Sequence, residues 1–170
     1  MRTAYEHNPD AGLPLSFHIM DGAPSKKVLQ SFHKDAGWNR PRKEIETTLS
    51  QIQRIQWAVV ELNGTNIGIA RLELAPPEFC YLSELIIKNK YRGRGIGQWF
   101  VHNIEQHCAR WGIPRLLLQP NNAQSTSFYE ALAFSPDPYV PGFLRKDINP
   151  FQGKKRFFQS GDRACSRHMP

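Results

Sequence analysis

A glycine-rich turn is the part of this chain whose residue types and spacing are best suited to chemistry. It reads Tyr91-Arg92-Gly93-Arg94-Gly95-Ile96-Gly97 and lies between a β-like run and an amphipathic helix. Glycines at 93, 95 and 97 allow positive φ and let a ligand approach the backbone closely. The helix that follows points unpaired N–H groups and the positive end of its dipole outward. With Lys88 and Lys90 adding charge, the turn is expected to hold a phosphate or pyrophosphate.

Other glycine-rich motifs fit this turn less well. A P-loop needs G-x-x-x-x-G-K-[ST], and the Lys-Ser/Thr pair is missing. A dinucleotide-binding G-x-G-x-x-G that starts at Gly93 fails because residue 98 is Gln98. Arginine-glycine segments that bind RNA normally lie in low-complexity sequence, whereas this turn is held between two regular elements. A tight turn with solvated charges is the remaining alternative.

The elements before the turn predict a meander of strands preceded by helices. A helix is expected over 25–35 with Ser25 as its N-cap, and another after Pro41 that presents Ile45, Leu49 and Ile52. Asn63-Gly64 is a strong hairpin signal between two β-rich runs. The strands are expected at 17–20, 57–62, 67–74 and 79–88.

After the turn the pattern alternates between helix and strand. A helix over 98–111 is expected to place Phe100, Val101, Ile104, Cys108 and Trp111 on one apolar face, and Gly112 and Pro114 end it. A strand at 115–119, a helix at 123–132 and a strand at 143–148 follow. The succession predicts an α/β (α+β) domain with a mostly antiparallel central sheet flanked by helices.

Length and charge bound the domain organisation. The 170 residues suit one domain, expected over 1–150 with a loose lead-in at 1–16, followed by a basic tail at 151–170. The net charge is +7, but residues 145–170 carry seven basic and two acidic side chains, so most of the excess lies near the C-terminus. We therefore do not expect the folded domain to bind nucleic acid. The tail could contact RNA, an acidic protein or a membrane surface, or have no specific partner.

The cysteines and the hydropathy pattern favour a cytoplasmic protein. Cys80, Cys108 and Cys165 are widely spaced and odd in number, which argues against a disulfide framework or a structural zinc site. No window approaches the 18 apolar residues of a membrane span. His102 and His107 are five apart on the expected helix and do not share a face, so no metal site is expected. We expect a monomer or a homodimer.

The glycine-rich turn also resembles a known family. Arg92-Gly93-Arg94-Gly95-Ile96-Gly97 is similar to the R/Q-x-x-G-x-G/A signature of the GCN5-related N-acetyltransferase (GNAT) superfamily, and the strand before it and helix after it match as well. The resemblance covers about 25–148. It implies a splayed strand pair that holds acetyl-coenzyme A (acetyl-CoA) as co-substrate, with no metal. The main chain of Arg92, Gly93, Arg94, Gly95, Ile96 and Gly97, with Gln98, would bind the pyrophosphate, and Leu85, Ile86 and Ile87 the pantetheine arm.

A second segment extends the resemblance. Asn122 to Phe134 looks like the family's N-x-x-A-x-x-h-Y-x-x-x-G-F pattern, with Ala133 where the family usually has Gly. Asn122 and Tyr129 are seven residues apart and share a helix face. The resemblance implies that Asn122 binds the pantetheine amides and that Tyr129 is the general acid beside the thioester sulfur. Alternatively, Tyr129 packs in the core, and Ser125 caps the helix or contacts coenzyme A.

Attack by an amine also requires a base or a water relay. Glu84 is the candidate, because strand alternation places it on the same face as Ile86, and Glu73 is the reserve choice. An exposed strand carboxylate without a catalytic role is the alternative. Cys108 falls on the apolar helix face, which favours direct transfer in a ternary complex over a cysteine intermediate.

The acceptor is expected to contact the loop 33–42 and the segment 136–145. These contain Trp38, Asn39 and Arg40, and Tyr139, Phe143 and Arg145. Aromatic rings there could hold an amine by cation–π contact, or could simply be core. A small-molecule amine is the first expectation, and a protein lysine or N-terminus the second. The alternative from another functional class is a regulatory module that binds acetyl-CoA without turnover.

Overall fold

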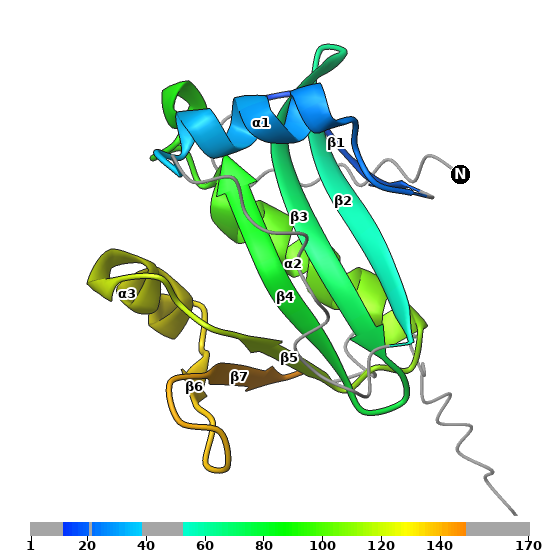
Figure 1. The fold of residues 1–170 in the computed structure, drawn as a ribbon, viewed down its shortest axis with the longest axis vertical. Coiled ribbons are helices and arrows are strands. Elements are labelled where there is room, and N and C mark those ends of the chain that lie inside the picture. The colour runs from blue at the N-terminus through cyan, green and yellow to red at the C-terminus, as the bar shows by residue number, and fades with distance from the viewer. Residues whose placement is uncertain (1–11, 21, 39–52, 149–170) are drawn as a thin grey trace, which may run out of the picture.

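A computed structural model describes residues 12–20, 22–38 and 53–148. The centre of the fold is one seven-stranded sheet (Figure 1). The strand order is β1-β2-β3-β4-β5-β7-β6. β1 (Leu15–Met20) pairs antiparallel with β2, so the predicted lead-in of 1–16 overlaps a strand by two residues. The helix expected after Pro41 and the tail at 151–170 lie outside the described residues.

The predicted meander is confirmed. β2 (Arg54–Leu62), β3 (Thr65–Ala75) and β4 (Phe79–Ile87) are consecutive antiparallel neighbours. Asn63 and Gly64 both have positive φ, at 50° and 78°, as a hairpin turn that follows the right-handed twist of its strands requires. β-branched and aromatic side chains along these strands fill the core on both sides of the sheet.

Helices cover opposite faces of the meander (Figure 1). α1 (Lys26–Asp35) begins at Ser25, whose hydroxyl accepts from the Val28 N–H, and buries Phe32 against one face. α2 (Ile96–Arg110) buries Phe100, Ile104 and Cys108 against the other. No helix in the described ranges is long and apolar enough to cross a membrane.

The apolar face predicted for α2 needs one correction. The expected Trp111 is 41% exposed, because it follows the last helical turn as the C-cap, and Trp99 is the buried tryptophan instead. The helix also begins at Ile96 rather than at residue 98. Gly112, at φ 70°, ends it as predicted.

The sheet opens between its two halves. β4 pairs in parallel with β5 (Arg115–Leu118) only at Cys80 and Tyr81. A register shift leaves Ser83 as an extra residue in β4, and such a bulge bends a strand and increases its twist. The remaining residues of β4 therefore run on without β5 beside them, as in the splayed pair that the family resemblance implies.

The second half completes the domain. α3 (Ala123–Ala131) follows β5, and the short β6 (Ser135–Pro136), which the sequence pattern did not indicate, pairs with β7 (Leu144–Asp147). β7 runs antiparallel to β5, and the Lys146 ammonium lies 2.6 Å from a Glu105 carboxylate oxygen on α2. The fold is the mixed, mostly antiparallel α/β architecture that the sequence predicts.

Candidate active site

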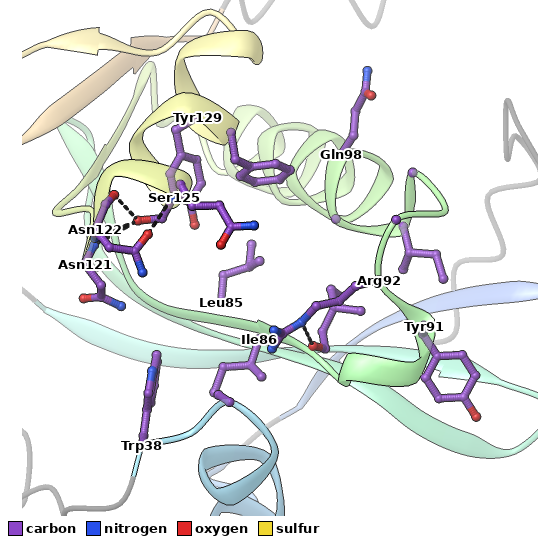
Figure 2. Close-up of a pocket in the computed structure, with 18 residues that line it drawn as sticks. Trp38, Leu85, Ile86, Tyr91, Arg92, Gln98, Asn121, Asn122, Ser125 and Tyr129 are labelled. Atoms are coloured by element: carbon purple, nitrogen blue, oxygen red, sulfur yellow. Dashed lines mark hydrogen bonds between the residues drawn. The ribbon is translucent and has the colours of Figure 1, made fainter.

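A pocket of about 480 Å³ opens where β4 and β5 separate (Figure 2). Leu85, Ile86 and Ile87 of β4 line it, as predicted. The glycine-rich turn and the start of α2 form one end, and α3 with the residues just before it forms the other. The pocket thus joins the two sequence segments that we singled out, although they are about thirty residues apart in the chain.

The glycine-rich turn is shaped by its backbone. Gly93 and Gly95 have φ of 72° and 76°, as predicted, and Gly95 is the N-cap of α2. The Arg92 Nε donates to the Ile87 carbonyl over 2.7 Å and closes the loop after β4. Because the first N–H groups of a helix have no intrahelical acceptor, residues 96–98 present free donors where they line the pocket. An anion would be stabilised there by these donors and by the helix dipole.

Gly97 has a different role from the one predicted for the three glycines. Its φ is not positive, because it lies inside the first turn of α2. A Cβ at this position would stand 3.2 Å from the Phe128 ring of α3. The missing side chain therefore lets α3 pack close to α2 at the pocket.

The predicted positive cluster is dispersed. The Lys88 ammonium lies 4.9 Å from the centre of the Phe32 ring, and that of Lys90 lies 4.8 Å from the Tyr91 ring. Arg94 is exposed and does not line the pocket, whereas Arg92 does. Backbone donors, rather than a ring of cations, dominate this end of the pocket.

Asn122 and Ser125 form a reciprocal cap at the start of α3. The Asn122 Oδ1 accepts from the Ser125 N–H over 2.8 Å, and the Ser125 hydroxyl accepts from the Asn122 N–H over 3.1 Å. These hydrogen bonds confirm the capping explanation of Ser125, and both residues also line the pocket. Within the described ranges, the Asn122 side-chain NH₂ has no hydrogen-bond partner and remains available to a ligand carbonyl.

Tyr129 is both a core residue and a pocket residue. Its ring packs edge-on against Phe128 and Phe134, at 5.0 and 5.4 Å between centroids, while its phenol reaches the pocket (Figure 2). Burial raises the pKa of the Tyr129 phenol well above its ordinary value, so the group stays protonated at neutral pH. No residue of the described ranges hydrogen-bonds to its hydroxyl. A neutral donor at the edge of the pocket is what protonation of a leaving group requires.

Comparison with known proteins identifies the family of this chain. The model of the Acetyltransferase (GNAT) family matches residues 26–134, which is more than half of the chain. The chain belongs to the GNAT acetyltransferase family. No curated protein matches it by sequence.

Solved structures of GNAT enzymes share the fold. GCN5 from Tetrahymena is 16% identical, with a TM-score of 0.62 over 79% of this chain and 96% of that one. The ribosomal-protein-S18-alanine N-acetyltransferase from Escherichia coli is 18% identical, with a TM-score of 0.56 over 78% and 94%. A GNAT family acetyltransferase from Elizabethkingia anophelis, solved with acetyl-CoA bound, is 12% identical, with a TM-score of 0.53 over 79% and 98%.

The carboxylates proposed as bases do not line the pocket of this GNAT domain. Glu84 does lie on the same side of β4 as Ile86, as predicted, but its side chain is 1% exposed and its Oε2 lies 3.0 Å from the His33 Nε2. Glu73 is fully buried, with its Oε1 3.1 Å from an Arg71 Nη1. The alternative of an exposed strand carboxylate is therefore wrong for Glu84.

Sequence reasoning missed part of the pocket wall. Asn121 lines it beside Asn122, and Phe128 beside Tyr129; the neighbouring motif residues were the only signal that could have indicated them. Trp38, expected in the acceptor loop, does line the pocket, at the edge opposite Asn121 (Figure 2). In the described part of the chain, no group of three or more His, Cys, Asp and Glu side chains could hold a metal ion.

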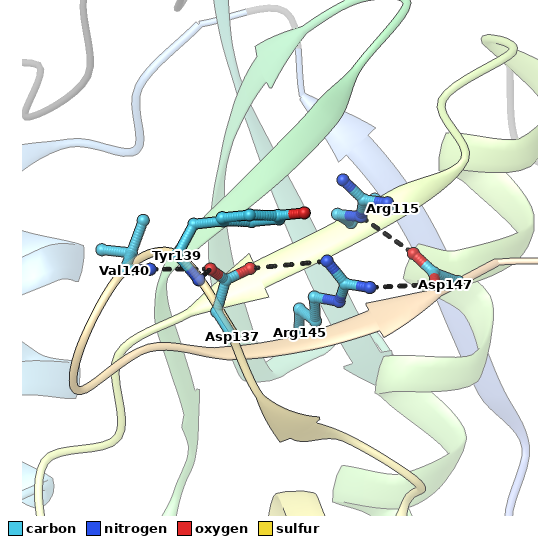
Figure 3. Close-up of polar contacts among 6 residues, drawn as sticks. All are labelled: Arg115, Asp137, Tyr139, Val140, Arg145 and Asp147. Atoms are coloured by element: carbon cyan, nitrogen blue, oxygen red, sulfur yellow. Dashed lines mark hydrogen bonds and ion pairs between the residues drawn. The ribbon is translucent and has the colours of Figure 1, made fainter.

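The other segment expected near the acceptor lies away from this pocket. Tyr139 is 84% exposed, and Asp137 accepts from its N–H and from that of Val140 (Figure 3). Arg145 pairs with Asp137 and Asp147, and Phe143 stacks on Tyr81 at 5.7 Å. None of these side chains is among the residues that line the pocket.

Proposed function

We propose that this chain is an N-acetyltransferase that transfers the acetyl group of acetyl-CoA to a primary amine, by direct attack in a ternary complex. The observation that carries the proposal is the pocket itself. It connects free backbone donors at the start of α2 with a neutral phenol, Tyr129, across an unpaired strand edge on β4. Acetyl-CoA has a pyrophosphate, two amides and a thioester in that order, which suits these three features. A GNAT relative in fold binds the same co-substrate.

Each end of the pocket has its part in the reaction. The turn from Arg92 to Gly97 and Gln98 would bind the pyrophosphate through main-chain N–H groups. The backbone of Leu85, Ile86 and Ile87 would pair with the pantetheine arm, and the Asn122 NH₂ would donate to an amide carbonyl of it. These contacts hold the thioester in one place, which lowers the entropic cost of the attack.

The chemistry at the thioester follows from Tyr129. When a neutral amine attacks the carbonyl carbon, the carbon–sulfur bond breaks and coenzyme A leaves as a thiolate. The Tyr129 hydroxyl would donate its proton to that sulfur, and the proton lost by the amine would pass to a base. The two described cysteines, Cys80 and Cys108, are fully buried and do not line the pocket, which supports direct transfer over an acetyl-cysteine intermediate.

The proposed acceptor is a small-molecule amine. Trp38 supplies an aromatic wall at the pocket edge, against which an ammonium or an apolar amine could pack. A protein lysine or N-terminus is the second candidate, favoured by the E. coli fold relative that acetylates ribosomal protein S18. A regulatory module that only binds acetyl-CoA would not need the protonated phenol.

Two measurements test this proposal. Titration calorimetry with acetyl-CoA should show one site per chain, and free-thiol release should depend on an added amine. The acceptors are tyramine, spermidine, and a lysine peptide with a free or a blocked N-terminus. Binding without thiol release for every acceptor would support the regulatory alternative, and no binding at all would overturn the proposed co-substrate. Release with the peptides alone would move the acceptor to the protein class.

A further inference from the structure

A hydrogen-bonded pair of His33 and Glu84 lies behind the end of the pocket that holds Tyr129. The His33 Nε2, in the last turn of α1, is 3.0 Å from the Glu84 Oε2 on β4. The Glu84 side chain is 1% exposed and that of His33 is 18% exposed, so the imidazole stands between the buried carboxylate and the surface. A carboxyl group buried to this extent needs hydrogen-bond partners, and the His33 imidazole is one of them. The bulge at Ser83 is what brings Glu84 to the α1 side, because Leu82 just before it packs on the α2 side.

Trp38 connects this pair to the pocket. Its ring lies 5.3 Å from the His33 ring between centroids, and its backbone N–H donates to the His33 carbonyl over 2.8 Å. The same indole lines the pocket, at the edge opposite Asn121 (Figure 2). The Trp38 ring therefore lies between His33 and the end of the pocket that holds Tyr129.

The hydrogen bond to Glu84 fixes the tautomer of His33. A carboxylate only accepts, so the Nε2 must carry the hydrogen and the Nδ1 of the neutral ring has the lone pair. Within the described ranges, no hydrogen bond occupies that Nδ1. The pair thus combines a nitrogen that can take a proton with a carboxylate that stabilises the resulting positive charge.

We propose that His33 accepts the proton that the acceptor amine loses, through a water beside Trp38, and that Glu84 is the positioning residue which holds the imidazole. The amine nitrogen bonds to the thioester carbon, the carbon–sulfur bond breaks, and the Tyr129 proton goes to the coenzyme A sulfur. The proton from the nitrogen goes to the His33 Nδ1, and exchange with solvent returns Tyr129 and His33 to their starting states. This assignment rests on the proposed function and replaces Glu84 as the group that takes the proton.

The test compares variants that keep the packing but remove the chemistry. His33→Gln retains an N–H that can donate to Glu84 and lacks a basic nitrogen, so kcat for thiol release should fall about 100-fold, a usual contribution of a general base. KM for acetyl-CoA and Tm should stay near the wild-type values. Glu84→Gln keeps an acceptor for His33 but loses the charge, and should lower kcat about tenfold. The same acceptors serve as probes.

His18→Gln is the matched control. His18 also pairs with a glutamate, at 3.2 Å from Glu61, and its side chain is 19% exposed against 18% for His33, but it lies on β1 and does not line the pocket. Its kcat should equal that of the wild type. If His33→Gln also keeps wild-type kcat, or loses acetyl-CoA binding together with stability, His33 has only a structural role and the proposal is overturned. Absence of thiol release by the wild-type chain itself would instead overturn the proposed function, and this assignment with it.

Discussion

At the scale of single residues, the site is a small set of polar atoms that the fold leaves without internal partners. The Tyr129 hydroxyl and the Asn122 NH₂ have no hydrogen-bond partner in the described part of the chain; the Tyr129 side chain is buried, whereas Asn122 is exposed. Buried or half-buried polar groups are normally satisfied within the protein or by water. Groups left open inside a pocket are therefore where a ligand gains most from binding.

Tyr129→Phe should separate chemistry from binding. Loss of the hydroxyl removes the proton donor to the thiolate, so kcat should fall about 100-fold. The ring contacts with Phe128 and Phe134 remain, so the acetyl-CoA Kd and Tm should change little. Tyr91→Phe removes a phenol from the opposite end of the same pocket and should leave kcat unchanged. Equal kcat in wild type and Tyr129→Phe would exclude Tyr129 as the acid.

The sequence could predict only those parts of the site that depend on residues close together in the chain. Gly93, Gly95, Asn122 and Tyr129 belong to local motifs, and all line the pocket. The environment of Glu84 depends instead on His33, fifty-one residues away, and on a bulge at Ser83 that no residue type signals. Strand alternation gave the correct face for Glu84 but could not show that α1 covers it.

At the scale of elements, a side chain added to the glycine-rich turn should reduce both the stability of the protein and its affinity for acetyl-CoA. Gly93→Ala puts an L-residue at φ 72°, which costs about 1 kcal/mol of stability, and places a methyl in open space at the pocket wall. We expect the acetyl-CoA Kd to rise about tenfold, measured by calorimetry, because the methyl and the ligand compete for that space.

The hairpin supplies the control for this change. Gly64→Ala creates the same strain at φ 78°, also with no atom near the new methyl, but between β2 and β3. It should lower stability by about 1 kcal/mol, with no change in acetyl-CoA affinity. A common loss of affinity in both variants would mean that stability, and not the turn, controls binding.

The end of α3 contains a strained residue that can be relieved. Ala133 has φ 66° because it occupies the C′ position of a Schellman motif, in which the Phe134 N–H donates to the Tyr129 carbonyl and the Ala133 N–H to that of Glu130. Ala133→Gly should therefore raise the free energy of unfolding by about 1 kcal/mol, measured by urea denaturation. Unchanged or reduced stability would contradict this account of the motif.

Sequence patterns predicted the elements better than their ends. Periodicity and Asn63-Gly64 gave the meander, because both signals are local. β6 is only two residues long and is defined by its pairing with β7, so no pattern could indicate it. The departure at Ala133 did not change the turn, because the helix end is fixed by backbone hydrogen bonds rather than by the residue type.

At the scale of the whole molecule, the sheet consists of two halves joined by a short seam. β4 and β5 pair only at Cys80 and Tyr81, whereas the β2–β3 and β3–β4 ladders run along whole strands. The halves share one apolar core, and the Lys146–Glu105 ion pair also links them. The pocket lies where the seam ends, so a ligand in it would contact both halves.

This arrangement predicts an uneven response to the co-substrate. Local opening costs least where few ladder hydrogen bonds hold an element, so amides of β5 and β7 should exchange with deuterium before those of β3. Saturating acetyl-CoA should slow exchange most in α3, in β5 and in the turn at 92–97, because it bridges the seam. Amides in the centre of β3 should exchange at the same rate with and without acetyl-CoA, as long as they exchange by local opening and not by global unfolding. Equal slowing across both halves would mean that the domain opens as one unit and that the seam has no mechanical role.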